Sequence, residues 1–165
     1  MSNKAIFYGS DTGNTEAAAK QIAAKLQADI FDVASNPKDK LAEYKNLILG
    51  TSTMGIGDLQ DDWASFLSDV ENADLNGKAI ALFGLGDADM YPDSFVDGMG
   101  EIYNTVKAKG CKIVGQVDTD GYEFDASTAV VDGKFVGLPL DEDNQSDLTN
   151  ERIEVWVEKI RNEFI

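Results

Sequence analysis

Two continuous apolar runs constrain the fold of this 165-residue chain more than any other feature of its sequence. Residues 47–50 and 79–83 contain no polar side chain, as expected of central strands that are covered on both faces. Shorter strand-like runs are expected at 4–8, 30–33 and 113–117. Because amphipathic segments separate these runs, the sequence predicts an α/β domain with a parallel sheet.

Four of the separating segments carry apolar residues at the spacing of one helix face. The four predicted buried faces are Ala19, Ile22, Ala23 and Leu26; Trp63, Phe66, Leu67 and Val70; Phe95, Met99, Ile102 and Val106; and Ile153, Trp156, Val157, Ile160 and Phe164.

Several residues mark where helices are expected to begin and end. Asn36 and Pro37 predict the N-cap and first residue of a further helix, one that buries Leu41. Thr149 is a candidate N-cap for the last helix, and Gly110 a candidate end for the helix that begins near residue 95.

The alternation of strands and helices breaks after Val117. Asp132-Gly133 is a strong hairpin signal, and strand-like residues resume at 135–138. We interpret this stretch as an insertion within the last strand. No repeat, linker or low-complexity segment is present, so we expect one domain, residues 1–165.

The composition narrows the possible partners. A formal charge of −16 disfavours nucleic acid and anionic membranes as partners. It favours basic protein partners, or else serves only solubility. Histidine is absent, and the lone Cys111 is expected to be a small buried hydrophobe. The acidic run 141–147 lacks the glycine and terminal glutamate of an EF-hand loop, so no metal site is expected. We expect a monomer in the cytoplasm, without a leader or a membrane span.

The expected strand at 4–8 leads into Ser10-Asp11-Thr12-Gly13-Asn14-Thr15 and then into an alanine-rich segment that is expected to be helical. Such a loop brings backbone N–H groups and a helix N-terminus around one point, which suits an anion. The loop lacks the Gly-Lys-Ser/Thr of a P-loop and the third glycine of the dinucleotide fingerprint. Taken alone, it is equally consistent with an ordinary N-capped helix.

Ligands of open α/β sheets bind beyond the carboxyl ends of the strands, so three segments should converge there. They are 10–15, 51–58 and 84–94. The second contributes Met54 and the third Tyr91, a pair suited to the two faces of a planar ring. Either residue taken singly is more typical of a half-exposed loop without a ligand, because exposed apolar residues are common.

The chain closely resembles the flavodoxins from end to end. The resemblance includes the hydroxyl-x-Thr-Gly-x-Thr loop at 10–15, Gly86-Asp87 with Tyr91, and the run 140–145. Residues 140–145 and the insertion resemble the long-chain subgroup. This resemblance implies a doubly wound five-stranded sheet of order 2-1-3-4-5 with helices on both faces and FMN at the switch point. The hydrophobic pattern of the sequence does not by itself give that strand order.

The resemblance also implies which residues bind FMN. Those at the phosphate are Ser10, Asp11, Thr12, Gly13, Asn14 and Thr15; those at the ring and ribityl chain are Ser52, Thr53, Met54, Gly55, Ile56, Leu85, Gly86, Asp87 and Tyr91, with Asp143 nearby. Many family members have tryptophan at the position of Met54, so the inner face of the ring should be held less tightly here. Gly55 is expected to let the preceding peptide turn its carbonyl toward flavin N5 in the one-electron-reduced state.

The expected function is a low-potential one-electron carrier that binds FMN non-covalently and uses its semiquinone/hydroquinone couple. It would have no substrate of its own, and would exchange electrons with reductases of the flavodoxin or ferredoxin type and with oxidoreductase acceptors. Residues 46–77 and 79–106 contain many carboxylates and no Lys or Arg, and these negative charges should resist the second electron. The alternative is a flavin-dependent NAD(P)H or quinone oxidoreductase on the same fold. A phospho-acceptor receiver domain is excluded, because Gly9-Ser10-Asp11 and Gly50-Thr51-Ser52 stand where its acidic residues should be.

Overall fold

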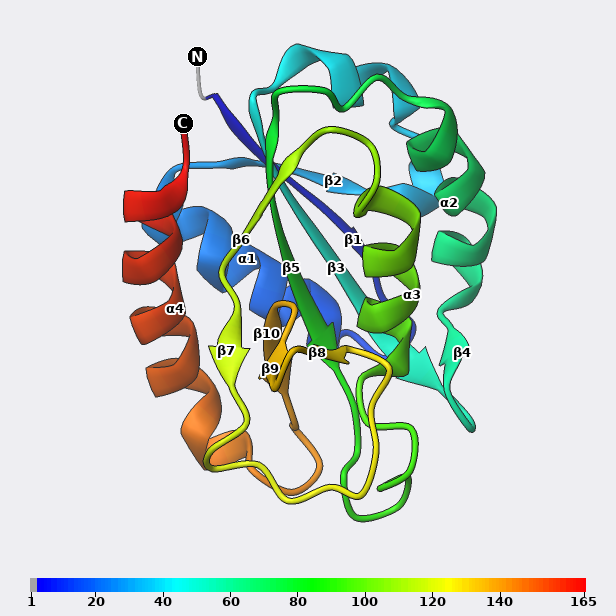
Figure 1. Ribbon diagram of the computed structural model, residues 1–165, viewed down its shortest axis with the longest axis vertical. Coiled ribbons are helices and arrows are strands. Elements are labelled where there is room, and N and C mark those ends of the chain that lie inside the picture. The colour runs from blue at the N-terminus through cyan, green and yellow to red at the C-terminus, as the bar shows by residue number, and fades with distance from the viewer. Residues whose placement is uncertain (1–2) are drawn as a thin grey trace.

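A parallel sheet runs through the centre of the computed structural model, which describes residues 3–165 (Figure 1). Its strands lie in the order β10-β5-β3-β1-β2. Their bounds are β1 (Lys4–Gly9), β2 (Asp29–Asp32), β3 (Asn46–Met54), β5 (Ala79–Leu85) and β10 (Leu138–Leu140). This order matches the expected 2-1-3-4-5 when β10 is counted as the fifth strand.

The fifth position of the sheet is filled by two separate pieces of chain. β6 (Lys112–Val114) pairs with the first half of β5, from Ala79 to Ala81, and β10 pairs with its second half, from Phe83 to Leu85. The chain leaves the sheet at Gly115, whose φ is 81°. The predicted insertion in the last strand is therefore confirmed, although the strand itself ends at Val114 rather than at Val117.

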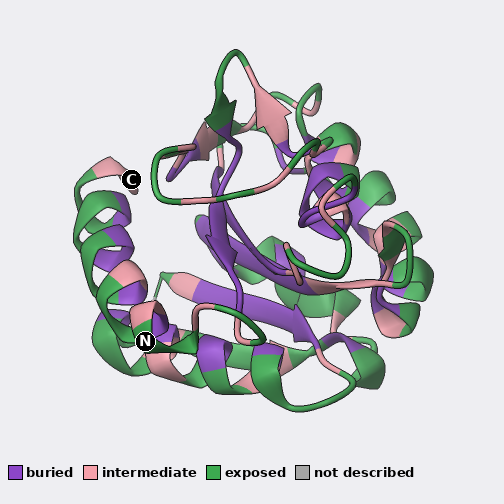
Figure 2. Cartoon of the chain, turned by 90° about the horizontal axis from the view of Figure 1, so that it is seen from below, coloured by how far each residue is buried: buried purple, intermediate pink, exposed green. Residues whose placement is uncertain are grey.

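Helices cover both faces of the sheet (Figures 1 and 2). α1 (Asn14–Leu26) and α4 (Thr149–Glu163) pack on one face; α2 (Asp61–Asn72) and α3 (Asp97–Val106) pack on the other. Alternate residues of one strand enter different cores: Ile6 packs with α1 and α4, and Phe7 with α2 and α3. Because both faces are covered, the central strands are buried along most of their length, as the unbroken apolar runs predicted.

The inserted segment forms a small antiparallel sheet of its own. Its strands are β7 (Val117–Asp118), β8 (Val130–Val131) and β9 (Lys134–Phe135), in the order β7-β9-β8. Asp132 and Gly133 join β8 to β9 with φ values of 54° and 80°, as a two-residue turn with two left-handed positions requires. The hairpin predicted at Asp132-Gly133 is confirmed.

A short strand after β3 was not predicted from the sequence. β4 (Asp58–Leu59) pairs antiparallel with the end of β3, so that Thr53 lies opposite Leu59 and Met54 opposite Asp58. The turn between them is Gly55-Ile56-Gly57, in which both glycines have positive φ. Segment 51–58 is therefore an ordered hairpin rather than an open loop.

The predicted helix after Asn36-Pro37 is wrong in type. Asp32 accepts a hydrogen bond from the Ala34 amide and starts the short 3₁₀ turn η1 (Val33–Ser35). Asn36 ends that turn with a left-handed φ of 55° instead of capping a helix, and only the 3₁₀ segment η2 (Lys38–Glu43) follows Pro37. The prediction that Leu41 is buried is confirmed.

Two predicted helix boundaries are also wrong. Thr149 is the first residue of α4 rather than its N-cap, because η3 (Ser146–Leu148) runs directly into that helix. The Thr149 hydroxyl instead donates a hydrogen bond to Glu142. α3 ends at Val106, before Gly110, whose left-handed conformation belongs to the turn that follows. In the part of the chain that the structure describes, no helix is both long and apolar enough to cross a bilayer.

We expect Trp63→Phe to lower the free energy of unfolding by about 1–3 kcal/mol, because a buried carbonyl would lose its donor. The Trp63 side chain is fully buried, and its indole N–H donates to the Gly50 carbonyl at 2.7 Å. Urea unfolding of the cofactor-free protein measures the change. Tyr103→Phe is a matched control, since Tyr103 is half-buried and its hydroxyl makes no hydrogen bond within residues 3–165. An equal loss in both variants would contradict a role for the indole hydrogen bond.

Candidate functional site

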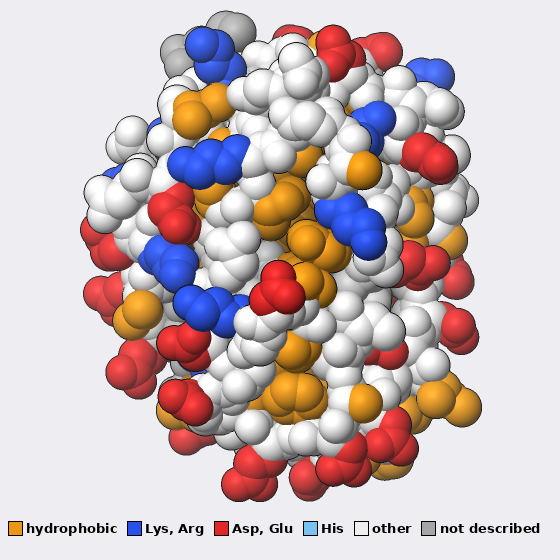
Figure 3. All heavy atoms as spheres, viewed as in Figure 1, with side chains coloured by type: hydrophobic (Ala, Val, Ile, Leu, Met, Phe, Trp, Pro, Cys, Tyr) orange, Lys and Arg blue, Asp and Glu red, His pale blue; other side chains and the backbone are white. Residues whose placement is uncertain are grey.

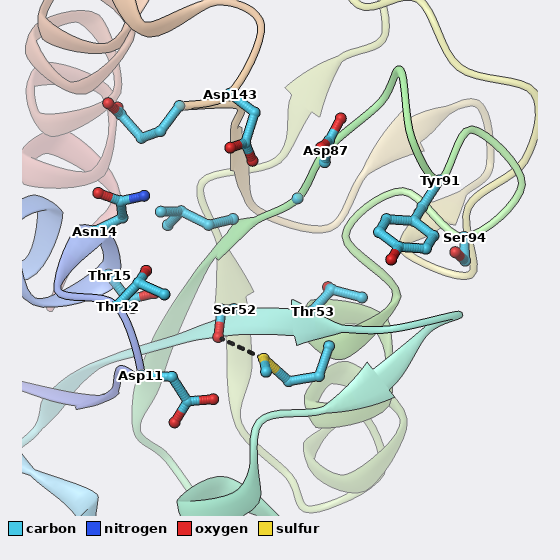
Figure 4. A pocket seen from close by; sticks show the side chains of 14 residues that line it. Asp11, Thr12, Asn14, Thr15, Ser52, Thr53, Asp87, Tyr91, Ser94 and Asp143 are labelled. Atoms are coloured by element: carbon cyan, nitrogen blue, oxygen red, sulfur yellow. Dashed lines mark hydrogen bonds between the residues drawn. The ribbon is translucent and has the colours of Figure 1, made fainter.

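A pocket of about 430 Å³ opens at the carboxyl ends of β1, β3 and β5, the lower end of the molecule in Figure 1. The three predicted segments meet there, and the segment after β10 joins them (Figure 4). The lining residues are Asp11, Thr12, Asn14, Thr15, Ser52, Thr53, Met54, Leu85, Gly86, Asp87, Tyr91, Ser94, Glu142 and Asp143.

One end of the pocket is formed by the loop before α1. Gly13 occupies the N-cap position of α1 with φ 93°, and no side chain caps the helix. Ser10 accepts a hydrogen bond from the Gly13 amide at 3.1 Å, which holds the loop in this shape. The first amides of a helix have no partner within it, so at α1 they are left free to bind an anion. This observation argues against the ordinary N-capped helix that the sequence left open.

The middle wall of the pocket comes from the end of β3. Ser52, Thr53 and Met54 lie in consecutive positions there, all half-buried. The Ser52 hydroxyl lies 3.8 Å from the Met54 sulfur, and the Thr53 hydroxyl accepts a hydrogen bond from the Gly98 amide at 3.0 Å (Figure 4). The Thr53 contact joins the wall to the first turn of α3. The wall is thus anchored from behind while its thioether remains at the pocket surface.

The far end of the pocket is formed by the 86–96 loop, which carries Tyr91. The Tyr91 amide donates to the Asp87 carbonyl at 2.9 Å, so the loop closes on itself. The Pro92 carbonyl accepts hydrogen bonds from the amides of Asp125 and Ala126, which belong to the inserted segment. Tyr91 keeps 39% of its surface exposed. An aromatic ring is therefore presented at the pocket on a loop that the insertion braces from outside.

Three carboxylates gather where the 86–96 loop meets the segment after β10. Oxygen atoms of Asp87, Asp141 and Asp143 all lie within 4.8 Å of one another. The Asn144 side-chain amide donates to Asp87 at 2.8 Å and to Asp141 at 2.9 Å, and the Ala88 amide donates to Asp141 at 3.1 Å. These hydrogen bonds hold the buried Asp141 and half-buried Asp87 as part of the loop framework.

The environment shifts the pKa values of two of these carboxyl groups in opposite directions. Burial opposes the charge of Asp87, but hydrogen bonds from the Met90 amide and from Asn144 outweigh it and lower the pKa of Asp87. The pKa of Asp143 is raised, first by partial loss of hydration and then by the negative charges of Asp87, Asp141 and Glu142. Asp143 is thus the carboxyl of this group for which the folded protein disfavours the charged form.

Most of the residues predicted from the sequence for this site line the pocket. Those that do not are Ser10 and Gly13, which shape the first loop, and Gly55 and Ile56, which lie in the turn after β3. Ile56 is 84% exposed. Ser94 and Glu142 line the pocket but were not predicted. Ser94 follows Tyr91 by three residues and Glu142 precedes Asp143, so proximity along the chain was the only available signal.

Acidic side chains surround this end of the molecule. Figure 3 shows Asp and Glu gathered along the lower edge, whereas Lys and Arg lie farther up. The described pocket lining includes Asp11, Asp87, Glu142 and Asp143 and no basic residue. An anion bound at α1 would therefore be held by neutral backbone and hydroxyl donors.

The fold and the pocket together define a doubly wound α/β protein with a pocket at the topological switch point, where ligands of this class of fold bind. The sequence model of the flavodoxin family matches residues 6–156. A flavodoxin of Helicobacter pylori is 48% identical, and flavodoxin 1 of Escherichia coli is 45% identical; each alignment covers 99% of this chain and at least 96% of the relative. The chain belongs to the flavodoxin family.

A solved structure agrees with this assignment. The Fusobacterium nucleatum flavodoxin bound to flavin mononucleotide superimposes with a TM-score of 0.93 at 36% sequence identity, covering 98% of each chain. The shared fold extends over the inserted segment as well as the sheet, because nearly all of both chains is matched.

Asp143→Asn should make the cofactor-free protein more stable at neutral pH, by less than about 1 kcal/mol because the side chain is exposed. A carboxyl whose folded pKa is raised destabilises the fold once it ionises, and the substitution removes that charge. The gain should disappear as the pH falls through the ordinary carboxyl range, where the aspartate is neutral in both folded and unfolded states. Urea unfolding at pH 7 and at pH 3 measures it, with Asp147→Asn as the control for loss of one charge. A gain that persists at pH 3 would contradict this explanation.

Proposed function

We propose that this protein is an electron carrier that binds one FMN non-covalently in the pocket and has no substrate of its own. The observation that carries the proposal is the uncapped N-terminus of α1 at one end of a pocket whose other end presents Tyr91. A flavodoxin of the same fold binds flavin mononucleotide, and the relatives are flavodoxins. When bound, FMN supplies one-electron chemistry, which no side chain of the pocket provides.

The residues present fit FMN chemically. The free amides at the start of α1, with Thr12 and the buried Thr15, provide neutral donors for a phosphate. Gly13, whose φ is 93°, lets the backbone approach it. Met54, Leu85 and Tyr91 supply a polarisable and aromatic lining for a flat ring system. Polar atoms from Ser52, Thr53 and the 86–96 loop complete a mixed lining of the kind that orients a planar cofactor.

We assign the predicted residues to two parts of the cofactor. Ser10, Asp11, Thr12, Gly13, Asn14 and Thr15 surround the phosphate, with Ser10 and Gly13 acting through the shape of the loop. The segments 52–56 and 85–87, together with Tyr91 and Asp143, surround the ring and the ribityl chain. Asp11 is fixed by a hydrogen bond of 2.9 Å from the buried Gln60, which ties the phosphate loop to α2.

The charges around the pocket favour a strongly reducing carrier. Each close carboxylate opposes the addition of negative charge to a bound cofactor by about 1–4 kcal/mol, depending on the effective dielectric. Asp87 contributes to this opposition at neutral pH, because its pKa is lowered and its carboxylate stays charged. The first electron, which can be accompanied by a proton, is thereby resisted less than the second.

The partners that fit this surface are redox proteins with basic docking faces: reductases of the flavodoxin or ferredoxin type as donors, and oxidoreductases as acceptors. Acidic groups at the pocket end would steer them by long-range attraction.

We further propose one domain over residues 1–165, a monomer, a cytoplasmic location, and membership of the long-chain subgroup. The three-stranded inserted sheet between β6 and β10 supports the subgroup. An oxidoreductase with its own substrate is not favoured, because the pocket lining offers no histidine or basic residue.

The test of the proposal is the cofactor itself. Purified protein should release one FMN per chain on denaturation, identified by mass, and should show no steady oxidation of NAD(P)H when no other protein is added. Release of FAD, or failure of the cofactor-free protein to take up FMN, would overturn the proposal. Steady turnover of NAD(P)H would favour the oxidoreductase instead.

Replacing Thr12 or Thr15 by Ala should weaken FMN binding by about 1.5–3 kcal/mol each, through loss of a charge-assisted hydrogen bond to the phosphate. Riboflavin, which has no phosphate, should bind both variants as well as it binds the wild type. Flavin fluorescence titrations measure both affinities. Thr105→Ala is the control, because its hydroxyl bonds to the Glu101 carbonyl on α3, outside the pocket lining. Equal losses for riboflavin and FMN would show that the loop does not hold the phosphate.

Gly55→Ala and Gly55→Thr should lower the midpoint potential of the first one-electron step, while the affinity for oxidised FMN barely changes. Gly55 has a φ of 51°, and a Cβ there would meet only Asp58, at 3.8 Å, so a side chain restricts the backbone without a clash. We expect the glycine to let the peptide after Met54 turn its carbonyl toward the cofactor in only one oxidation state. Loss of that hydrogen bond, at about 1 kcal/mol, corresponds to about 40 mV for one electron.

A redox titration measures the potentials. Gly133→Ala is the matched control, because Gly133 also has positive φ and open space around it but lies in the β8–β9 turn. Unchanged potentials in both Gly55 variants would show that this turn does not tune the cofactor.

A further inference from the structure

Ser94 carries a buried hydroxyl that the protein itself does not use. Its Oγ is the one buried side-chain nitrogen or oxygen atom without a hydrogen-bond partner among residues 3–165. The residue is only 4% exposed and lines the pocket. Burying a hydroxyl without a partner is costly, so native proteins usually avoid it or give the group a task.

The position of Ser94 is fixed by its backbone. Its amide donates to the Tyr91 carbonyl at 3.3 Å, and its carbonyl accepts from the Asp97 amide at 3.2 Å. On the other side it contacts the turn between β3 and β4, where a Cβ on Gly57 would come within 3.3 Å of the Ser94 Cβ. The side chain is therefore held between the 86–96 loop and that turn, two of the elements that form the pocket.

Polar groups from the neighbouring β3 end, α3 and inserted segment make hydrogen bonds that do not include Ser94. Thr53 Oγ1 accepts from the Gly98 amide at 3.0 Å, and Asp97 Oδ1 accepts from the Thr128 amide at 2.8 Å. The nearby Ser127 hydroxyl donates to the Phe95 carbonyl at 2.5 Å and accepts from the Ala129 amide at 3.1 Å. The Ser127 hydroxyl therefore contributes hydrogen bonds to the fold, whereas the Ser94 hydroxyl contributes none.

Figure 4 places Ser94 next to Tyr91, at the side of the pocket across from Thr12, Asn14 and Thr15. A ligand whose phosphate lies at the start of α1 extends its ring system toward Tyr91 and Ser94. The polar atoms that a flavin ring offers there are carbonyl oxygens and ring nitrogens, with which a hydroxyl can act as donor or acceptor. We propose that Ser94 is a positioning residue that hydrogen-bonds to a polar atom of the isoalloxazine ring and fixes the ring against Tyr91.

This inference rests on the proposed function, and its test separates the two. Cofactor-free wild type and Ser94→Ala are titrated with FMN and with riboflavin, and the visible spectrum of each complex is recorded. We expect Ser94→Ala to bind both flavins about 3- to 10-fold more weakly, since one neutral hydrogen bond is lost. The spectrum of bound FMN should shift as well, because the bond is made to the ring.

Unfolding of the cofactor-free protein supplies the second readout. Ser94→Ala should be at least as stable as wild type, because its hydroxyl has no partner to lose. Ser127→Ala is the matched control and should show the opposite pattern: lower stability with little change in flavin affinity. Failure of wild type to bind FMN would overturn the proposed function. Normal FMN binding with no change in Ser94→Ala, or a loss for FMN but not for riboflavin, would overturn the role of Ser94 alone.

Discussion

The structure depends on a parallel sheet that is covered on both faces and in which glycines let neighbouring segments of chain pack closely. At Gly50 a Cβ would lie 2.0 Å from the Phe83 ring, and at Gly137 it would lie 2.0 Å from the Leu82 carbonyl oxygen. The first glycine allows a bulky ring into the adjacent strand, and the second lets the returning chain approach β5. Parallel pairing then brings the carboxyl ends of β1, β3 and β5 to one edge, and the pocket is built there.

The two ends of the pocket are held in place in different ways. The donors at the start of α1 are fixed by a helix and a strand, while Tyr91 sits on a loop whose carbonyl at Pro92 is tied to the inserted segment. Ser94 links that loop to the β3–β4 turn. The proposed phosphate and ring ends of the site are thus supported by different parts of the chain, so substitutions at Thr12 and at Ser94 should affect different parts of the cofactor.

The sequence predicted the sheet, the four α-helices and the hairpin because each leaves a local pattern: apolar runs, helical spacing, or Asp-Gly. It failed where neighbours decide the outcome. Asn36 is a good N-cap by type, but Asp32 starts a competing 3₁₀ turn and places Asn36 at its end. Thr149 is not the N-cap of α4, because η3 runs directly into that helix and makes Thr149 its first residue. Within the site, Ser94 and Glu142 were missed since neither stands in a recognisable motif, and only the folded loops bring them to the pocket.

The division of the fifth strand between β6 and β10 has a consequence for how the chain folds. β6 can extend the sheet soon after β5, because α3 alone lies between them. β10 reaches its register only after the inserted segment closes a long loop, and the entropy of that closure opposes early pairing. The entropic cost grows only slowly with loop length, so most of it comes from closing the loop at all rather than from its exact length. The last half-strand should accordingly be a late event in folding, completing an edge that is otherwise already assembled.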